Sequence, residues 1–389
     1  MPSTAGEVRA ASVNAQPNVV IYTHSLLGAS MTFILSHAEA LKRYSPVYAG
    51  AHRVDGLTLP EGKVATANRG GVLGSAEEIL FRRFGLAGRL ASRLRPFQPS
   101  IVHAHFGQSG PAALTLAKSL GVPVVVTYHG QDATISDDEL RRSWRGREYL
   151  RGRPGVMANA ALIIAVSDFI RDRLISQGFP KEKVVTHRNG IDLNVFRRSP
   201  GPREPIVVFV GRFVEKKGCE YLVRALGRLR QSGLPVRGVL IGDGVLAESL
   251  QVLAAEVAAD VRFAGFLGPA DVRSWIGRAT LVAVPSVTAA DGNSEGLPTV
   301  LLEAQAMGTP IVTTRHAGNA EGVIEGRSAL LVDERDVDGL AQAIRYFLEN
   351  PEAVESFGRA GRTHVESNFD IDTQSVGLER LYDRARESA

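Results

Sequence analysis

The sequence has little that would support a disulfide framework, a cysteine metal site or a membrane span. Its 389 residues include a single cysteine, Cys219, which excludes intrachain disulfides and cysteine clusters. The longest apolar runs are short pieces such as ALIIAV, well below the roughly 20 residues that a helix needs to cross a bilayer. The first residues have no apolar segment typical of a signal peptide, so we expect a cytoplasmic protein.

Acidic residues are absent from a long stretch, Ile79 to Gln131. Residues 1–200 carry 25 Lys and Arg against 15 Asp and Glu, whereas the remainder carries 20 against 26. A basic first half joined to an acidic second half indicates an anionic partner for the first half. The aromatic side chains interleaved with the basic ones are too few for a stacking platform, so we expect no nucleic acid.

The pattern along the chain alternates between short β-branched runs and helical stretches. NVVIYTHS, SIVHAHFG, PVVVTYHG and ALIIAVSDF predict strands of a parallel sheet covered on both faces. The proline-rich RRSPGPREP predicts a linker, after which IVVFVGRF, RGVLIGDG, VRFAGF, TLVAVPS and PIVTT predict a second such unit. We therefore expect two doubly wound Rossmann-like α/β domains that face a central cleft.

We expect four segments: a flexible tail over residues 1–16, a first domain over 17–198, a second domain over 199–370, and a helix over 371–389. This division follows the linker and the restart of the strand pattern.

Three stretches lie at or just after the ends of predicted strands and are candidate binding sites. In GRFVEKKG, Arg212 and Lys217 have the spacing and chemistry to hold a diphosphate. The alternative is a basic turn whose side chains are simply solvated. In VTYHGQDA, His129 lies at the carboxyl edge of a strand, facing the expected cleft, or else is a structural histidine. In VHAHFG, His103 and His105 share one face of a strand, which suits a metal site or, as we favour, polar packing.

The glycines of LIGDGVLA resemble the dinucleotide fingerprint G-x-G-x-x-A. However, the acid expected at the end of the next strand is misplaced, because Asp260 precedes that strand. We therefore expect no nicotinamide or flavin cofactor.

Arginines alternate with apolar residues in FRRFGLAGRLASRLRPFQP. One interpretation is an interfacial helix on anionic lipid, and the other is a core-packed helix with a solvated arginine face. The basic residues are Arg82, Arg83, Arg89, Arg93 and Arg95.

Together, VFVGRFVEKKG, NGID, LIGDG and EGLPTVLLEAQAMGTPIVTT resemble the retaining glycosyltransferases of family 4, which have the GT-B fold. Glu295 and Glu303, eight positions apart, match the paired glutamates of that family. HGQDA and HSLLGASMTF are most similar to the exopolysaccharide branch of the colanic acid and amylovoran type. Where many members have a glycine pair after the first strand, this chain has Gly28 in LLGAS.

The resemblance implies that the first domain binds the acceptor, that the second binds the nucleotide sugar and that the final helix packs toward the first domain. It also implies a role for each motif. Glu295 would face the donor sugar, Glu303 would accept hydrogen bonds from the ribose, and His129 would contact the sugar. Arg212 and Lys217 would neutralise the leaving diphosphate beside the helix that begins at Gly296 to Pro298, so no metal or other cofactor is expected. Further substrate contacts are implied for Gly28, Gly130, Asp132, Asn189, Gly211, Gly242, Asp243, Gly244, Phe266, Gly296, Leu297, Pro298 and Thr299.

The resemblance therefore implies transfer of a sugar, with retention, from a UDP- or GDP-sugar to a saccharide acceptor, and we expect a lipid-linked oligosaccharide at the membrane surface. A transferase that makes a small soluble glycoside is an open alternative. A nucleotide-sugar-binding protein without catalytic activity is a second open alternative. Slow hydrolysis of the donor by the purified protein would exclude it.

Overall fold

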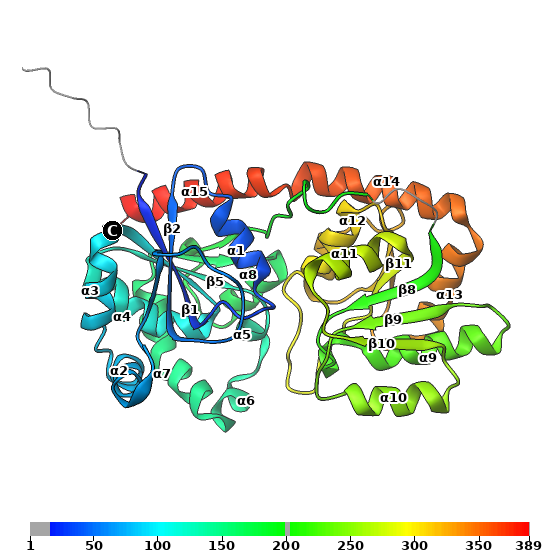
Figure 1. Ribbon diagram of the computed structural model, residues 1–389, viewed down its shortest axis with the longest axis horizontal. Helices are drawn as coiled ribbons and strands as arrows, with labels where there is room; N and C mark the ends of the chain where they lie inside the picture. Colours follow the sequence, from blue (N-terminus) through cyan, green and yellow to red (C-terminus); the bar gives the residue numbers. More distant parts are fainter. Residues whose placement is uncertain (1–15, 199–202, 389) are drawn as a thin grey trace, which may run out of the picture.

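A computed structural model describes residues 16–198 and 203–388, so residues 1–15 of the predicted tail and the centre of the predicted linker lie outside the described residues. Two parallel sheets form the centres of two domains (Figure 1). The first has seven strands in the order β3-β2-β1-β4-β5-β6-β7, and the second has six in the order β10-β9-β8-β11-β12-β13. The predicted pair of doubly wound α/β domains is confirmed.

The first sheet contains every strand that the sequence predicted there, together with β2, β3 and β7, which the analysis did not predict. Its strands are β1 (Asn18–Leu26), β2 (Ser45–Arg53), β3 (Val64–Thr66), β4 (Pro99–His105), β5 (Val124–Tyr128), β6 (Leu162–Ala165) and β7 (Val184–Thr186). The helices around it are α1 (Thr32–Glu39), α2 (Gly71–Phe84), α3 (Gly88–Leu94), α4 (Gly110–Leu120), α5 (Gln131–Thr134), α6 (Asp137–Arg142), α7 (Trp144–Asn159) and α8 (Asp168–Ser176).

The second sheet adds one strand, β13, to the five that were predicted. Its strands are β8 (Glu204–Val210), β9 (Arg237–Ile241), β10 (Val261–Gly265), β11 (Ala279–Val284), β12 (Ile311–Thr314) and β13 (Ala329–Val332). The helices of this half and of the C-terminus are α9 (Cys219–Gln231), α10 (Ala247–Glu256), α11 (Pro269–Arg278), α12 (Thr299–Ala306), α13 (Val337–Glu349), α14 (Pro351–Asn368) and α15 (Ile371–Glu387).

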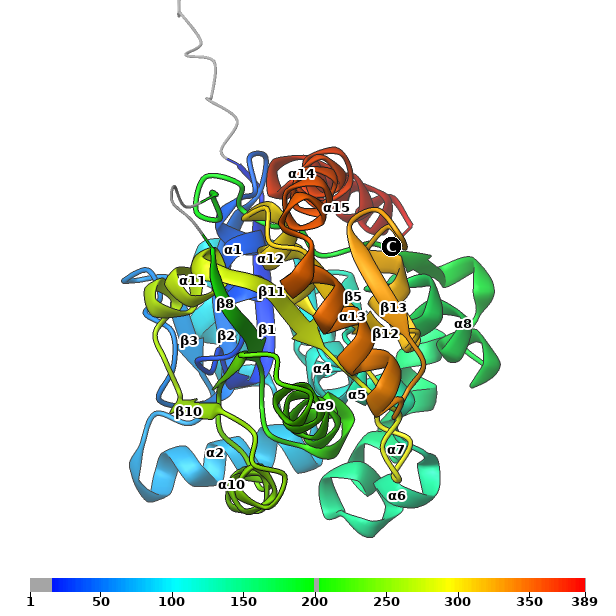
Figure 2. The ribbon, with the colours of Figure 1, turned by 90° about the vertical axis from the view of Figure 1, so that its right-hand side faces the viewer.

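Both sheets have buried strands because helices cover both faces, as their continuous apolar runs predict. The central strands β4, β5 and β6 end in buried residues, and β11 is buried throughout. Viewed end-on, the second sheet lies between α9 and α13 on one face and α11 and α12 on the other (Figure 2). All pairings are parallel, so the carboxyl ends of each sheet's strands gather at one edge, where ligands bind in such folds.

The C-terminal helices connect the two halves of the molecule. α14 packs on α12, whereas α15 runs along the first domain (Figure 1). Leu378, Tyr382 and Ala385 of α15 are buried in an apolar cluster with residues of the first sheet. The Tyr382 hydroxyl also hydrogen-bonds His103 Nδ1 at 2.7 Å, which fixes the helix against β4.

The arginine-rich segment is not one helix. Gly85 adopts a left-handed conformation with φ 66°, which ends α2, and α3 begins at Gly88. Within the described residues, no helix is both long and apolar enough to cross a membrane.

Candidate active site

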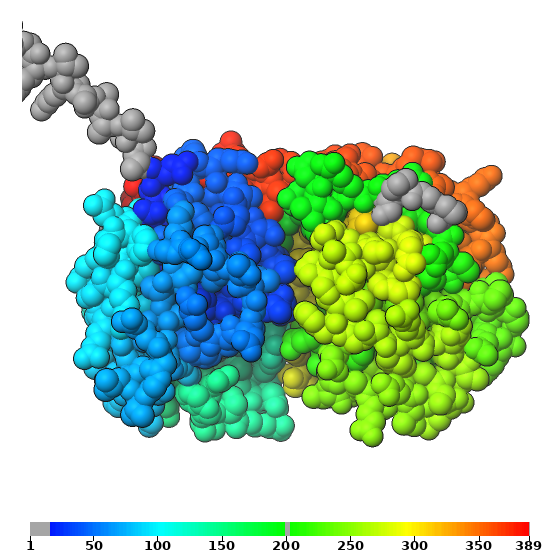
Figure 3. All heavy atoms as spheres, in the orientation of Figure 1, coloured from blue at the N-terminus to red at the C-terminus, as the bar shows by residue number. Residues whose placement is uncertain are grey.

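A cavity of ≈ 780 Å³ lies between the two domains. A hollow separates the two halves in the space-filling view (Figure 3). His24 and His129 line the cavity from the first domain, and Arg212, Lys216 and Asp291 line it from the second. The cavity therefore lies where the sequence predicted a cleft, between the carboxyl edges of the two sheets.

Glu295 lies just behind the wall that Lys216 forms. Its carboxylate is buried, with Oε1 2.8 Å from Lys217 Nζ and Oε2 3.6 Å from Lys216 Nζ. Burial alone would raise the pKa of Glu295, but the two lysines outweigh it and lower the pKa to about 2. Glu295 is thus a carboxylate at neutral pH, held between two ammonium groups.

Lys216 was missed by the sequence analysis, which selected Lys217 from the same KK pair. Lys216 is buried, donates to the Ser294 carbonyl at 3.2 Å and lines the cavity. Burial lowers its pKa, an effect that Glu295 opposes. Arg212, by contrast, is exposed at the cavity wall. A buried lysine and an exposed arginine together present positive charge to the cavity.

His316 is a second residue that the sequence gave no reason to select. Its Nε2 accepts a hydrogen bond from the Glu295 backbone N–H at 3.2 Å, and its Nδ1 lies 2.6 Å from Glu334 Oε1. Glu334 therefore orients the ring so that Nε2 is an acceptor. Through this chain, His316 positions the Glu295 loop.

Glu303 lies within α12, as predicted, but the helix begins at Thr299, and Gly296 and Leu297 belong to the loop before it. Pro298 is the N-cap residue rather than part of the first turn, because its ψ of 121° is extended. Burial raises the pKa of Glu303, while a hydrogen bond from Thr299 and the charge of Arg273 oppose the rise. Glu303 does not line the cavity between the domains.

His129 faces the cavity from the end of β5. Its Nε2 lies 3.1 Å from His105 Nδ1, whereas its buried Nδ1 has no partner among the described residues. Burial keeps the pKa of His129 well below its usual value, so the ring is neutral near pH 7. The cavity is therefore lined here by a neutral imidazole whose unpaired nitrogen is buried.

Asp132 fixes the loop that carries His129. Its carboxylate accepts hydrogen bonds from the backbone N–H groups of Gly107, His129 and Gly130 at 2.7 to 3.0 Å. Burial raises the pKa of Asp132, and these donors counteract it. Asp132 lines the cavity, but its oxygens are engaged by the backbone.

The two domains touch directly beside the candidate site. A Cβ on Gly130 would lie 2.8 Å from the backbone nitrogen of Gly296, so a side chain there would push the domains apart. The Ser294 N–H donates to Thr134 Oγ1 at 3.0 Å across the same junction. The loops carrying His129 and Glu295 are therefore in direct contact.

The glycines of the LIGDG stretch bring a second loop against the GRF turn. A Cβ on Gly242 would lie 2.0 Å from the Gly211 carbonyl oxygen, which leaves no room for a side chain. The Asp243 carboxylate instead accepts a hydrogen bond from the Gly244 backbone N–H at 2.7 Å. These glycines thus serve loop packing beside Arg212.

Three of the other predicted contacts are not part of the cavity lining. Gly28 forms a bridge with Gly56, Asn189 is buried, and Phe266 is 70% exposed, and none of them lines the cavity. The favoured packing interpretation of the HAH stretch fits the contacts: His103 bonds Tyr382 and Thr127, and His105 bonds His129.

Comparison with known proteins identifies the family. Residues 32–195 match the family described as Glycosyltransferase Family 4, and residues 193–364 match Glycosyl transferases group 1. The glycosyltransferase WcaL of Escherichia coli (strain K12), named for colanic acid biosynthesis, is 33% identical over 73% of this chain and 70% of its own. This chain belongs to glycosyltransferase family 4.

Another relative of this glycosyltransferase is the amylovoran biosynthesis glycosyltransferase AmsK of Erwinia amylovora, 30% identical over 72% of this chain and 69% of AmsK. The family resemblance inferred from the motifs is therefore confirmed.

Two solved structures show the same fold. Sucrose-phosphate synthase from Thermosynechococcus elongatus has a TM-score of 0.75 at 20% identity and covers 96% of this chain and 100% of its own. Anabaena HepE, solved with UDP and glucose, has a TM-score of 0.74 at 19% identity and covers 94% of this chain and 99% of its own. This glycosyltransferase thus has the GT-B fold.

Proposed function

We propose that this glycosyltransferase moves a sugar from a nucleoside diphosphate sugar to a saccharide acceptor, with retention at the anomeric carbon. The observation that carries the proposal is the group formed by Glu295, Lys216 and Lys217, of which Lys216 lines the cavity between the domains. Two ammonium groups and the exposed Arg212 guanidinium supply the positive charge that a departing diphosphate requires.

The proposed chemistry divides among a few residues. Lys217 and Arg212 stabilise charge that grows on the leaving diphosphate, so they act mainly in the transition state. Glu295, held ionised by the lysines, accepts hydrogen bonds from donor-sugar hydroxyls, and His129 contacts the sugar from the opposite wall. Glu303 accepts hydrogen bonds from the ribose. With attack and departure on the same face of the sugar, the leaving phosphate takes the acceptor's proton.

Because protein cations supply this charge, we propose that donor cleavage needs no metal ion. Turnover should persist in EDTA, which is checked by measuring nucleoside diphosphate release with and without the chelator. Loss of turnover that Mg²⁺ or Mn²⁺ restores would show that the lysines and Arg212 are insufficient.

We propose that the acceptor is a lipid-linked oligosaccharide in exopolysaccharide assembly, at the cytoplasmic face of a membrane. Two kinds of observation support this proposal: WcaL and AmsK are named for exopolysaccharide synthesis, and α2 presents exposed apolar residues to solvent. These are Val72, Leu73, Ile79, Leu80 and Phe84, followed by Leu86.

The arginines between residues 82 and 95 do not form one continuous surface. Arg82 is 3.3 Å from Glu78 and 3.5 Å from Glu148, and Arg93 is 2.8 Å from Glu77, so both are engaged within the protein. Arg83 and Arg89 are exposed near the apolar residues of α2. The proposed membrane surface therefore consists of that apolar face with Arg83 and Arg89.

A thermal-shift panel tests the donor proposal. UDP, GDP, ADP and TDP, each with and without a sugar, are added to the purified protein. One base should stand out, since a ligand at about 100 times its Kd stabilises a protein by about 2.7 kcal/mol. The matching sugar nucleotide should then be hydrolysed slowly without acceptor, and its transfer product should keep the donor's anomeric configuration by NMR. Binding without hydrolysis or transfer to any offered saccharide would instead indicate a nucleotide-sugar-binding protein.

A further inference from the structure

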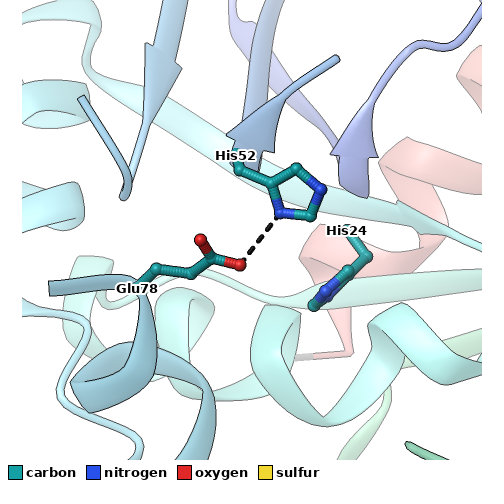
Figure 4. A group of neighbouring side chains, drawn as sticks. All are labelled: His24, His52 and Glu78. Carbon is teal, nitrogen blue, oxygen red and sulfur yellow. Dashed lines mark hydrogen bonds and ion pairs between the residues drawn. The ribbon is translucent and has the colours of Figure 1, made fainter. Parts of the chain in front are cut away.

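Three potential metal ligands converge at the acceptor side of the cavity. His24 lies near the end of β1, His52 lies near the end of the neighbouring strand β2, and Glu78 extends from α2 toward both (Figure 4). One ligand atom from each residue lies within 4.8 Å of those of the other two. Parallel strands and one helix therefore bring two imidazoles and a carboxylate to a common point.

The atoms that would not contact an ion have partners that orient the ligands. The two atoms that would contact the ion, His52 Nδ1 and Glu78 Oε1, lie 2.9 Å apart. On the other side of the ring, His52 Nε2 lies 3.1 Å from Ser25 Oγ. The second oxygen of Glu78 accepts a hydrogen bond from Asn68 Nδ2 at 2.9 Å. Metal-binding histidines and carboxylates are characteristically held in this way by groups behind them.

His24 contributes an unsatisfied group to this cluster. Its Nε2 is buried and has no hydrogen-bond partner among the described residues, although an unpaired buried nitrogen is costly. The main chain at His24 is fixed by a hydrogen bond from its N–H to Ser109 Oγ at 3.2 Å. The catalytic and binding roles assigned to the donor side do not use this nitrogen.

We propose that His24, His52 and Glu78 bind a divalent transition-metal ion such as Zn²⁺. Two imidazoles and one carboxylate are a characteristic zinc ligand set that leaves a coordination position open. The ion would take the place of the proton between His52 Nδ1 and Glu78 Oε1, while the neutral ring keeps its single proton on Nε2, facing Ser25 Oγ. His24 and Ser25 line the cavity, so the open position faces the space offered to an acceptor hydroxyl.

Two neighbouring positive charges, on Arg82 and on Arg145, oppose a cation at this point. The Arg82 guanidinium lies 3.3 Å from Glu78 Oε1. However, Arg82 also lies 3.5 Å from Glu148 Oε2, and its Cζ lies 4.9 Å from the centroid of the Trp144 ring. These two contacts can retain Arg82 when Glu78 turns to the ion, so the arginine lowers metal affinity without blocking the site.

The test measures metal binding directly and does not depend on glycosyl transfer. Metal-free wild-type protein is titrated with Zn²⁺ in competition with a chromophoric chelator, and with Co²⁺ followed by its visible absorption. We expect one ion per chain, with Co²⁺ spectra typical of imidazole ligands. Failure of the wild-type protein to compete for Zn²⁺ would overturn the proposal.

Variants locate the ion. Glu78→Gln, His52→Gln and His24→Gln should each weaken Zn²⁺ binding by about 100-fold or more, and Ser25→Ala by roughly 10- to 100-fold, the range typical of outer partners. His364→Gln and the exposed Glu61→Gln are matched controls, since neither residue belongs to the cluster. Equal Zn²⁺ affinity in Glu78→Gln and Glu61→Gln, both folded by circular dichroism, would contradict the assignment even if the wild type binds zinc.

The ion and the donor chemistry are separable. The cluster belongs to the first domain, whereas Lys216, Lys217 and Glu295 belong to the second. EDTA should therefore empty the metal site and still leave donor hydrolysis intact.

Discussion

At the residue scale, the paired glutamates of α12 and its preceding loop have opposite electrostatic surroundings. Lysines hold Glu295 ionised, whereas burial raises the pKa of Glu303. The two are proposed to contact different parts of the donor, so their substitutions should separate transfer from nucleotide binding.

Glu295→Gln should leave affinity for the free nucleoside diphosphate almost unchanged and lower turnover by about 100-fold or more. Glu303→Gln should weaken the nucleotide itself by about 1–3 kcal/mol, the penalty for spoiling a charged hydrogen-bond acceptor. Calorimetric titration and initial rates distinguish the two effects, with the exposed Glu248→Gln of α10 as control. Equal losses of nucleotide affinity in both variants would contradict the proposed division.

Sequence reasoning identified residues that belong to local motifs and missed those that act across the fold. Glu295 and Lys217 stand in recognisable stretches, and the structure pairs them at 2.8 Å. His316 contacts Glu295 only because β12 lies beside β11, and Lys216 reaches Ser294 from a distant turn. Neither contact leaves a pattern in one sequence, because each depends on strand order.

At the element scale, α2 combines an exposed apolar face with a buried edge near the cavity. Leu73 is 81% exposed and Phe84 64%, whereas Phe81 is buried. The sequence pattern predicted one amphipathic helix over residues 81–99, which is wrong because Gly85 ends α2 and most of the exposed apolar face precedes Phe81. Nor could the pattern show which arginines are paired inside the protein.

Leu73→Ser with Phe84→Ser should reduce binding to anionic vesicles, because the apolar face would no longer enter the interface. Arg83→Gln with Arg89→Gln should reduce it further, by about 1 kcal/mol per residue. Vesicle co-sedimentation measures both effects, and activity on a short water-soluble acceptor should survive. Arg93→Gln is the matched control, since Glu77 engages that side chain. Unchanged sedimentation of the serine variant would leave α2 without a membrane role.

At the scale of the whole molecule, the two sheets and their order of elements could be predicted because buried parallel strands have near-continuous apolar runs. Short strands such as β3 and β7, three residues each, carry too little pattern to be distinguished from loops. The closeness of the domains could not be predicted either, since it depends on contacts such as that between Gly130 and Gly296.

Buried histidines should make the fold sensitive to mild acid. Burial lowers the pKa of His37 and His105 to about 3 and that of His187 to about 4. The unfolded chain binds these protons near pH 6.5, so the free energy of unfolding should fall below that pH, by up to about 1.4 kcal/mol per pH unit for each histidine. The loss should continue until pH approaches the folded-state values.

Urea denaturation at pH 7.5, 6.5 and 5.5 measures this dependence. His37→Gln removes one group that must stay neutral, so its stability should fall less steeply between pH 6.5 and 5.5 than that of the wild type. Parallel pH profiles for the two proteins would show that His37 does not titrate as its burial requires.

The most direct test of the account is the rate at which the matching sugar nucleotide releases its nucleoside diphosphate in EDTA. Wild-type protein should turn over, and Lys217→Ala and Arg212→Ala should each be slower by about 100-fold or more, because each removes a cation aimed at the leaving group. The exposed Lys118→Ala of α4 should match the wild type. Near wild-type rates in both Lys217→Ala and Arg212→Ala would contradict the claim that this cavity performs the transfer.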